Sequence, residues 1–551
     1  MKLNESTWLL EEKIGQLFIC GFHSLEADEQ ILTLIKDYHV GGTVYFRRNI
    51  ESVPQLAALS SALQRLPRNH ADVPLFIAID QEGGMVARLD HEGMSRIPGN
   101  MSLGAADDLS LTEATARLAA KEMLALGINF NFAPCIDVNN NPANPVIGVR
   151  SFGENPLKVA EQGVAAITGF QQQGVIATAK HFPGHGDTAV DSHRGLASVP
   201  HDKERLNAVE LLPFRHAIEA GVDAIMTAHV IFPAFEPDGI PATLSRKVLT
   251  DLLRTELGYQ GVIVTDCLEM HAISKESGIA EGAVQSLEAG ADLVLVSHTL
   301  SDQIAAIEAV KKAVKEGRIT EERINQSVER VLRLKEQRLG TPTFEAGKEV
   351  LAASVQISLT PEEERVPLLT QIAEKSVTLV KKGSNFPLNA AKPVLVVWPE
   401  LRHRTEVDEP AVHRYTLADA LENCGVQVEL AVIGTYPEDE ELEQVLKASL
   451  AYDQIVVVTY TAEGSLPEGQ KQLVQELCRI HEDRVVAVST RNPYDINEFP
   501  EAETYLCLYE NRSYALDALA KVITGRLQPT GVLPVGLNNS YPAGFSYTLN
   551  Y

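Results

Sequence analysis

The sequence has few of the features that mark secreted, membrane-spanning or metal-binding proteins. Only six of its 551 residues are cysteines, and no C-x-x-C pair occurs that could hold a metal or form a redox couple. No uninterrupted apolar run is long enough to span a bilayer, and the first residues lack the charged start and apolar stretch of a secretory signal. We therefore predict reduced, mostly buried cysteines in a soluble, cytoplasmic protein without membrane insertion.

Clusters of basic residues are also missing. The chain carries 48 Lys and Arg against 74 Asp and Glu, which gives a formal net charge of -26. Because binding to a phosphate backbone needs clustered Lys and Arg, the composition argues against nucleic acid as a partner. No repeat or low-complexity tract is present. A chain of this length exceeds one ordinary core and predicts two or more domains.

Short apolar runs and longer helical stretches alternate up to about residue 340, a pattern typical of parallel strands joined by crossover helices. Eight apolar runs are present, at residues 17–21, 43–46, 75–79, 130–138, 175–179, 224–228, 262–265 and 293–297. Eight such units predict a (β/α)8 TIM barrel, an α/β fold whose chemistry lies at the carboxyl ends of the strands.

A second domain follows this barrel. The helix expected over 320–338 ends before Gly340 and Pro342, which stop helices. We therefore predict a barrel over 1–340, a linker over 341–365 and a second domain over 366–551. Its strands are expected at 394–398, 428–433, 455–460, 485–489 and 505–509, separated by helices such as 440–452 and 466–482. This alternation predicts a sheet with helices on both faces.

Polar side chains follow five of the eight predicted barrel strands. They are Asp80 after the third, Arg150 in the loop after the fourth, Lys180 and His181 after the fifth, His229 after the sixth and Asp266 after the seventh. Since barrel strands end at one mouth, we expect these side chains to converge. Any one of them equally suits a helix cap or a satisfied loop, whereas the set favours a catalytic or binding site.

The segment 180–193 has the densest chemistry in the chain and reads KHFPGHGDTAVDSH. Gly184 and Gly186 allow a tight turn or a mobile loop. Asp191 and His193 are two residues apart, so the carboxylate can orient the imidazole and raise its pKa, which supplies an acid near neutrality. The alternative for this pair is a hydrogen bond that only stabilises the loop.

Asp266 ends an apolar strand, which holds its carboxylate rigidly at the barrel mouth. Cleavage of a glycosidic bond needs an ionised carboxylate beneath the anomeric carbon and a second group that protonates the leaving oxygen. We predict that Asp266 is this nucleophile. The alternative is a helix N-cap, and Glu269 three residues later makes a capping box conceivable; Glu269 itself is expected to be structural.

A further group of charged residues suits the hydroxyl groups of a sugar. Asp80 and Arg88 flank a glycine pair, and Arg150 with the Lys180-His181 pair adds hydrogen-bond donors. The positive charge of Arg150 and of the Lys180-His181 pair is expected to keep Asp266 ionised. The alternative is a set of surface salt bridges.

Metal binding is the main rival for the histidine-rich loop. The possible ligands are His181, His185, His193, Asp187 and Asp191, which carry the groups that catalytic zinc prefers. Metal-dependent hydrolase barrels commonly place further ligands on the first strand, and residues 17–22 offer none. The sequence therefore favours a site without metal.

Together these segments resemble glycoside hydrolase family 3, specifically its β-N-acetylglucosaminidase branch, which the motif K-H-F-P-G-H-G-D-T-x-x-D-S-H marks. The resemblance spans essentially the whole chain. It continues at residues 80–88, 150–156, 226–229, 241–245 and 264–266, and through the family's αβα sandwich domain at 373–380 and 529–534. Met85 is a departure, because the branch usually carries arginine there.

The resemblance implies a retaining removal of terminal β-linked N-acetylglucosamine, typically from peptidoglycan-derived muropeptides during cell-wall recycling. It implies Asp266 as nucleophile and His193 as acid/base with Asp191 as its partner. The sugar contacts that it implies are Asp80, Arg88, Arg150, Lys180 and His181. No cofactor or metal is implied, and the expected partner is a small carbohydrate substrate.

Three other functions remain open at this point. A phosphorylase of the same family fits because a neutral histidine repels phosphate less than a carboxylate would. A β-glucosidase with relaxed sugar choice would share the same residues. A non-enzymatic carbohydrate-binding protein fits less well, since it would not need an Asp-His dyad facing a carboxylate.

Overall fold

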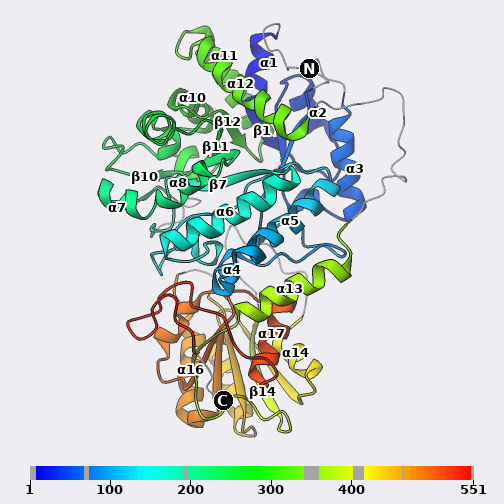
Figure 1. The fold of residues 1–551 in the computed structure, drawn as a ribbon, viewed down its shortest axis with the longest axis vertical. Helices are drawn as coiled ribbons and strands as arrows, with labels where there is room; N and C mark the ends of the chain where they lie inside the picture. The colour runs from blue at the N-terminus through cyan, green and yellow to red at the C-terminus, as the bar shows by residue number, and fades with distance from the viewer. Residues whose placement is uncertain are drawn as a thin grey trace.

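The structure, a computed structural model, describes residues 8–66, 73–189, 195–340, 359–400, 415–461 and 464–547. Its N-terminal part is a closed barrel of parallel strands in the order β1-β12-β11-β9-β7-β6-β3-β2 (Figure 1). The strands are β1 (Phe18–Gly21), β2 (Gly42–Tyr45), β3 (Phe76–Ile79), β6 (Phe130–Asn131), β7 (Ile176–Phe182), β9 (Ala224–Thr227), β11 (Val262–Cys267) and β12 (Leu293–Val296). Each overlaps one predicted run, so the TIM barrel is confirmed.

Helices surround the barrel. They are α1 (Leu10–Gly15), α2 (Glu29–Lys36), α3 (Val53–Gln64), α4 (Asn100–Ala106), α5 (Leu109–Ala125), α6 (Pro156–Gln173), α7 (Lys203–Ala208), α8 (Leu212–Glu219), the π-helix η5 (Lys247–Glu256), α9 (His271–Ser274), α10 (Ile279–Ala289), α11 (Leu300–Lys315) and α12 (Glu321–Leu339). Local sequence explains their ends. For α6, the Asn155 side chain accepts from the Leu157 amide at 3.0 Å, Pro156 takes the first helical position, and Gly174 ends the helix with a φ of 97°.

The barrel interior is apolar, with edge-on contacts between Phe76, Phe130 and Phe132 whose ring centroids are 5.2 Å apart. One fully buried cation lies beside the amino ends of β1 and β2. Lys335 of α12 donates through Nζ to Gln16 Oε1 at 2.9 Å and to the Gly41 carbonyl at 2.8 Å. The last helix of the barrel is thereby tied to its first two βα units.

The second domain is built on a sheet in the order β13-β18-β17-β16-β14-β15. Its strands are β13 (Thr378–Lys381), β14 (Val394–Glu400), β15 (Val428–Gly434), β16 (Ile455–Thr459), β17 (Val485–Ser489) and β18 (Thr504–Cys507). Five of these strands were predicted. The sixth, β13, was not, and it is the strand that pairs antiparallel, with β18.

Helices cover both faces of this sheet, as the sequence predicts. They are α13 (Glu362–Ser376), α14 (Leu417–Asn423), α15 (Asp439–Ser449), α16 (Glu468–His481) and α17 (Ser513–Ile523). Alternate residues of β14 enter two separate apolar clusters, Leu395 and Val397 in one and Val394 and Val396 in the other. The domain is therefore an αβα sandwich.

The two domains are packed against each other through barrel loops near the strand ends (Figure 1). Val149 and two residues of α4, Met101 and Ala105, join the apolar cluster on one face of the second sheet. The Glu154 amide donates to the Pro534 carbonyl at 3.0 Å. Loops that reach the mouth of the barrel therefore also contact the second domain.

None of the helices in the described part of the chain is both long and apolar enough to cross a membrane. All six cysteines are free thiols, and five of them are buried as predicted. The exception is Cys267, which is half-buried.

Candidate active site

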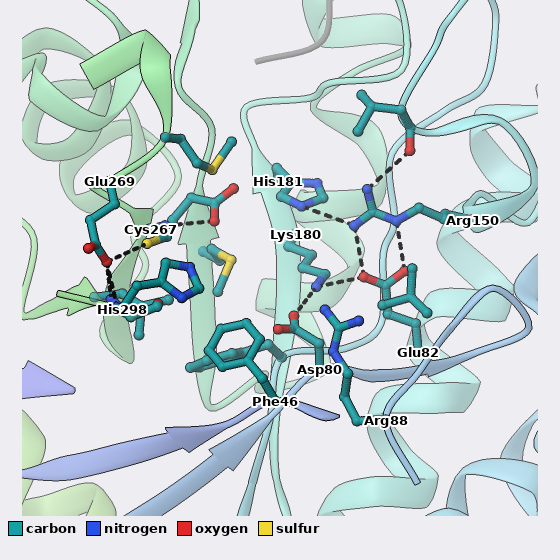
Figure 2. Close-up of a pocket in the computed structure, with 18 of the residues that line it drawn as sticks. Phe46, Asp80, Glu82, Arg88, Arg150, Lys180, His181, Cys267, Glu269 and His298 are labelled. Carbon is teal, nitrogen blue, oxygen red and sulfur yellow. Dashed lines mark hydrogen bonds and ion pairs between the residues drawn. The ribbon is translucent and has the colours of Figure 1, made fainter. Parts of the chain in front are cut away.

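A cavity of about 600 Å³ opens at the carboxyl ends of the barrel strands (Figure 2). It is lined by six of the eight residues to which the sequence analysis gave catalytic or sugar-binding roles, namely Asp80, Arg88, Arg150, Lys180, His181 and Asp266. The other two, Asp191 and His193, lie outside the described residues. The fold thus brings together side chains from the ends of β3, β7 and β11 and from the loop after β6.

Glu82 is the centre of an ion-pair cluster on one side of the cavity, and the sequence analysis missed it. Arg150 donates to its two carboxylate oxygens at 2.9 and 2.8 Å. Lys180 Nζ lies 2.7 Å from Glu82 Oε1 and 2.8 Å from Asp80 Oδ1. Burial alone would raise the pKa of Glu82, but Arg150 and Lys180 outweigh it and hold the pKa far below its usual range. The four side chains therefore form a fixed lattice of ion pairs (Figure 2).

The backbone after β3 explains how Glu82 reaches this position. Residues 81–87 form a small hairpin of β4 (Gln81–Gly83) and β5 (Val86–Ala87), turned by Gly83 and Gly84 with φ of 97° and 58°. Extended backbone points alternate side chains the same way, so Glu82 follows Asp80 into the cavity. That two-residue spacing was the available signal in the sequence.

His181 is oriented by a second carboxylate that the sequence analysis missed, Asp137. His181 Nδ1 lies 2.7 Å from Asp137 Oδ2, and its Nε2 lies 3.4 Å from the Arg150 guanidinium. Burial acts to raise the pKa of Asp137, but His181 and His185 lower it to about 2. The ionised carboxylate accepts from Nδ1–H, which leaves Nε2 facing Arg150 and the cavity.

Asp266 lies within β11, where its Oδ1 accepts from the Cys267 amide at 2.7 Å. The next helix, α9, starts at His271 with Met270 as its N-cap, so the helix-cap alternative for Asp266 is wrong. Glu269 accepts from the Ser297 and His298 amides, both at 2.7 Å, and from the Thr299 amide at 2.9 Å. Glu269 thus fixes the loop after β12 and leaves Asp266 as the carboxylate at the end of β11.

The other side of the cavity combines an aromatic ring and an imidazole with charged groups. The His298 ring lies 5.1 Å from the Phe46 ring, and the Arg48 guanidinium lies 4.3 Å from the same ring while bonded to the Phe22 and Ser297 carbonyls. Burial lowers the pKa of His298 and raises that of the Cys267 thiol to about 12. A neutral imidazole, an aromatic ring and a protonated thiol therefore lie beside Arg48 and Glu269, across the cavity from the lattice (Figure 2).

Residues 185–187 of the histidine-rich loop, which follow β7 closely, are firmly anchored. Asn144 donates to the His185 and Gly186 carbonyls at 2.9 and 3.0 Å, and His201 Nε2 lies 2.5 Å from Asp187 Oδ2. A Cβ at Gly186 would lie 1.8 Å from the Val138 carbonyl oxygen. At this position glycine allows close packing of the loop against Val138.

His229 departs from the expected convergence. Its ring nitrogens lie 2.8 Å from Thr243 Oγ1 and 2.9 Å from the Cys267 carbonyl, and it is fully buried outside the lining of the cavity. Through the Cys267 carbonyl, His229 supports the backbone next to Asp266.

Three groups of described residues bring possible metal-ligand atoms within 4.8 Å of one another. They are Cys135, Asp137 and His181; Cys267, Glu269 and His298; and Asp187, His201 and Glu210. His181 and Asp187 fall into different groups, and His185 falls into none of them. The described members of the zinc set considered from the sequence therefore do not form one site. His185 is instead bonded through Nδ1 to Thr188 Oγ1 at 2.8 Å, and burial lowers its pKa to about 4.

Comparison with known sequence families gives two matches. The family described as "Glycosyl hydrolase family 3 N terminal domain" matches residues 9–334, and the family described as "Glycosyl hydrolase family 3 C-terminal domain" matches residues 275–546. The curated protein β-hexosaminidase A of Pseudoalteromonas piscicida is 33% identical over 566 residues, which cover 93% of this chain and 91% of that protein.

Solved structures give the same picture. A glycoside hydrolase family 3 β-N-acetylglucosaminidase from Paenibacillus sp. str. FPU-7 has a TM-score of 0.91 and 49% identity, over 97% of this chain and 99% of that one. The β-glucoside phosphorylase BglX, with a TM-score of 0.79 and 23% identity, covers 96% of this chain and 94% of its own. At that identity the second likeness concerns the fold alone.

Proposed function

The chain belongs to glycoside hydrolase family 3, and from this premise we propose that it is a retaining β-N-acetylglucosaminidase with Asp266 as its nucleophile. It is a glycoside hydrolase, and the similar proteins that are named for β-N-acetylhexosamine chemistry support this sugar choice. The observation that carries the proposal is the single carboxylate of β11 facing the lattice of Asp80, Glu82, Arg150 and Lys180 across one cavity.

The proposed first step is attack of an Asp266 oxygen on C1 of the terminal sugar. The C1–Asp266 bond forms as the glycosidic C1–O bond breaks, and the leaving oxygen takes a proton from His193. In the second step neutral His193 accepts a proton from water, which displaces Asp266 from C1. Two inversions at C1 return the product with its original β configuration.

The charged lattice is proposed to hold the sugar. Its ion pairs fix the Arg150 and Lys180 side chains before any ligand arrives, so their hydrogen-bond donors need no reorganisation on binding. Asp80, Arg88 and His181 add further polar contacts at the same wall. The cations also favour the ionised form of Asp266.

The roles of His193 and Asp191 are proposed from the sequence motif, and the anchoring of the preceding loop residues by Asn144 and His201 supports them. We further propose that the natural substrates are peptidoglycan-derived muropeptides and that the protein acts in the cytoplasm. Six free thiols suit a reducing compartment. We propose that the side of the cavity around Phe46 and His298 receives the leaving group.

A mechanism-based label tests the nucleophile and the stereochemistry together. A fluorinated N-acetylglucosaminyl donor with a good leaving group should accumulate as a covalent adduct, and peptide mapping should find it on Asp266. Asp266→Asn should remove turnover with folding intact, whereas Glu269→Gln should lower thermal stability and leave the adduct on Asp266. An adduct on another residue, or a product released as the α anomer, would refute the mechanism.

Product analysis separates hydrolysis from phosphorolysis. We expect free N-acetylglucosamine from an aryl β-N-acetylglucosaminide in both the presence and absence of phosphate. Predominant formation of the sugar 1-phosphate would contradict hydrolysis.

A further inference from the structure

The second domain contacts the turn that carries Glu82. We propose that Glu510 and Arg512, in the loop between β18 and α17, are positioning residues for the sugar-binding lattice. They fix the glycine turn of the β4–β5 hairpin and the start of α4, and thereby the places of Glu82 and Arg150. The inference deepens the proposed function of this cavity and rests on it.

The first contact is made by Arg512, whose guanidinium donates to the carbonyl of Gly84. Gly84 is two residues from Glu82 and also donates through its own amide to the Ile97 carbonyl at 2.9 Å. The next residue, Met85, packs against the apolar cluster of the second sheet. The hairpin turn is therefore held between the barrel segment at Ile97 and the second domain.

The second contact is made by Glu510, whose Oε2 accepts from the Gly99 amide at 3.2 Å. Gly99 is the N-cap of α4, and a Cβ on Gly84 would lie 2.7 Å from the Gly99 Cα, so the two glycines touch directly. The first residue of α4, Asn100, donates to the Arg150 carbonyl at 2.7 Å. Glu510 thus binds the residue directly before Asn100, whose side chain fixes the Arg150 backbone.

The loop that presents both charges is itself rigidly placed. Tyr509 adopts a φ of 64°, in the left-handed region that bulky residues rarely enter, and it is fully buried with its hydroxyl 2.8 Å from Thr378 Oγ1. Such a conformation persists only where its surroundings impose it, and it clusters at functional positions. Here it directs Glu510 and Arg512 out of the second sheet and toward the barrel.

Both routes end on the two partners of one bidentate ion pair. Arg512 acts through Gly84 on Glu82, and Glu510 acts through Gly99 and Asn100 on Arg150. Because a displacement of about 1 Å can cost on the order of a hundredfold in rate, loosening either route should weaken binding and turnover measurably.

Steady-state kinetics on an aryl β-N-acetylglucosaminide test this inference. Arg512→Gln and Glu510→Ala should each raise KM about tenfold, with a smaller effect on kcat, because the lattice already holds the sugar in the ground state. Arg512→Lys keeps a donor for Gly84 and should recover part of the loss. The matched control is Lys375→Gln, which removes a 2.7 Å bond between α13 and Asp108 of the barrel away from the hairpin.

The outcomes are distinct. The inference fails if folded Arg512→Gln and Glu510→Ala keep KM within twofold of the wild type, or if Lys375→Gln raises KM as much as they do. If circular dichroism shows that Arg512→Gln does not fold, the KM values of Glu510→Ala and Arg512→Lys decide the test. A wild-type protein without turnover refutes the proposed function instead, and thermal stabilisation of the same variants by N-acetylglucosamine then tests the pocket geometry separately.

Discussion

Replacing Glu82 by glutamine is expected to be strongly destabilising. The substitution keeps the size of the side chain but removes the carboxylate that pairs with buried Arg150, and leaves buried Lys180 with Asp80. Removing one partner of a buried ion pair costs about 3–5 kcal/mol, because the remaining charge is left uncompensated. The bidentate geometry and the two cations place Glu82 toward the upper part of that range.

The loss can be converted into a melting temperature. A domain of the size that residues 9–334 span has an unfolding entropy of about 0.7 kcal/mol/K, so a loss of about 4 kcal/mol lowers Tm by roughly 6 °C. Since the pKa of Glu82 is held below its usual range, its stabilising contribution is complete above pH about 4.3 and is lost as the pH falls further. The Tm difference between wild type and Glu82→Gln should therefore shrink toward pH 3.

Differential scanning calorimetry from pH 3 to pH 8 measures both quantities. Glu113→Gln is the control, because Glu113 pairs with Arg117 at 3.0 Å on an exposed helix face and should contribute about 1 kcal/mol or less. A Glu82→Gln barrel that melts within 2 °C of the wild type at pH 7, or a Tm difference that does not depend on pH, would refute the reasoning.

Two further predictions concern other parts of the molecule. Burial, opposed by Arg512, raises the pKa of Glu510 to about 7, so its contribution to stability is complete below pH about 4.3 and is lost as the pH rises through 7. Glu510→Gln keeps an acceptor for the Gly99 amide, and its free energy of unfolding should therefore exceed that of the wild type by on the order of 2 kcal/mol at pH 8 and by little at pH 4.5. Urea unfolding measures this difference, and an equal difference at both pH values would contradict the prediction. Turnover of an aryl β-N-acetylglucosaminide should exceed that of the matching aryl β-glucoside by at least tenfold in kcat/KM, and comparable values would show that the 2-acetamido group is not recognised.

The barrel could be predicted from the sequence because its strands are buried on both faces and therefore read as continuous apolar runs. Where a strand is short, the same signal misleads. The run 130–138 yields only two strand residues in β6, since Pro134 cannot donate to a ladder and the remaining apolar side chains are buried in a loop. The strand β13 was missed, and it pairs through Thr378 and Cys507 with a distant part of the chain.

The residues of the site likewise fall into those that the sequence predicted and those that it missed. Strand-end position was enough to bring Asp80, Lys180 and Asp266 into one cavity. Glu82 had a local signal, its two-residue spacing from Asp80. The ion pair of Glu82 with Arg150 and the bond of Asp137 to His181 join residues 68 and 44 positions apart, which no local pattern encodes. The same reasoning explains His229, which stands at a strand end but is turned into the protein by Thr243 and the Cys267 carbonyl.

The buried contacts of Lys335 have a consequence for biosynthesis. The strand β1 pairs with β12, and Lys335 of α12 binds Gln16 and Gly41 just before β1 and β2, so the first strand lacks both of these late partners while most of the barrel is still being translated. A nascent chain can complete this domain only after about 340 residues have emerged from the ribosome. Until then the edge of β1 is exposed, and a chaperone that shields it during synthesis would raise the yield of folded protein.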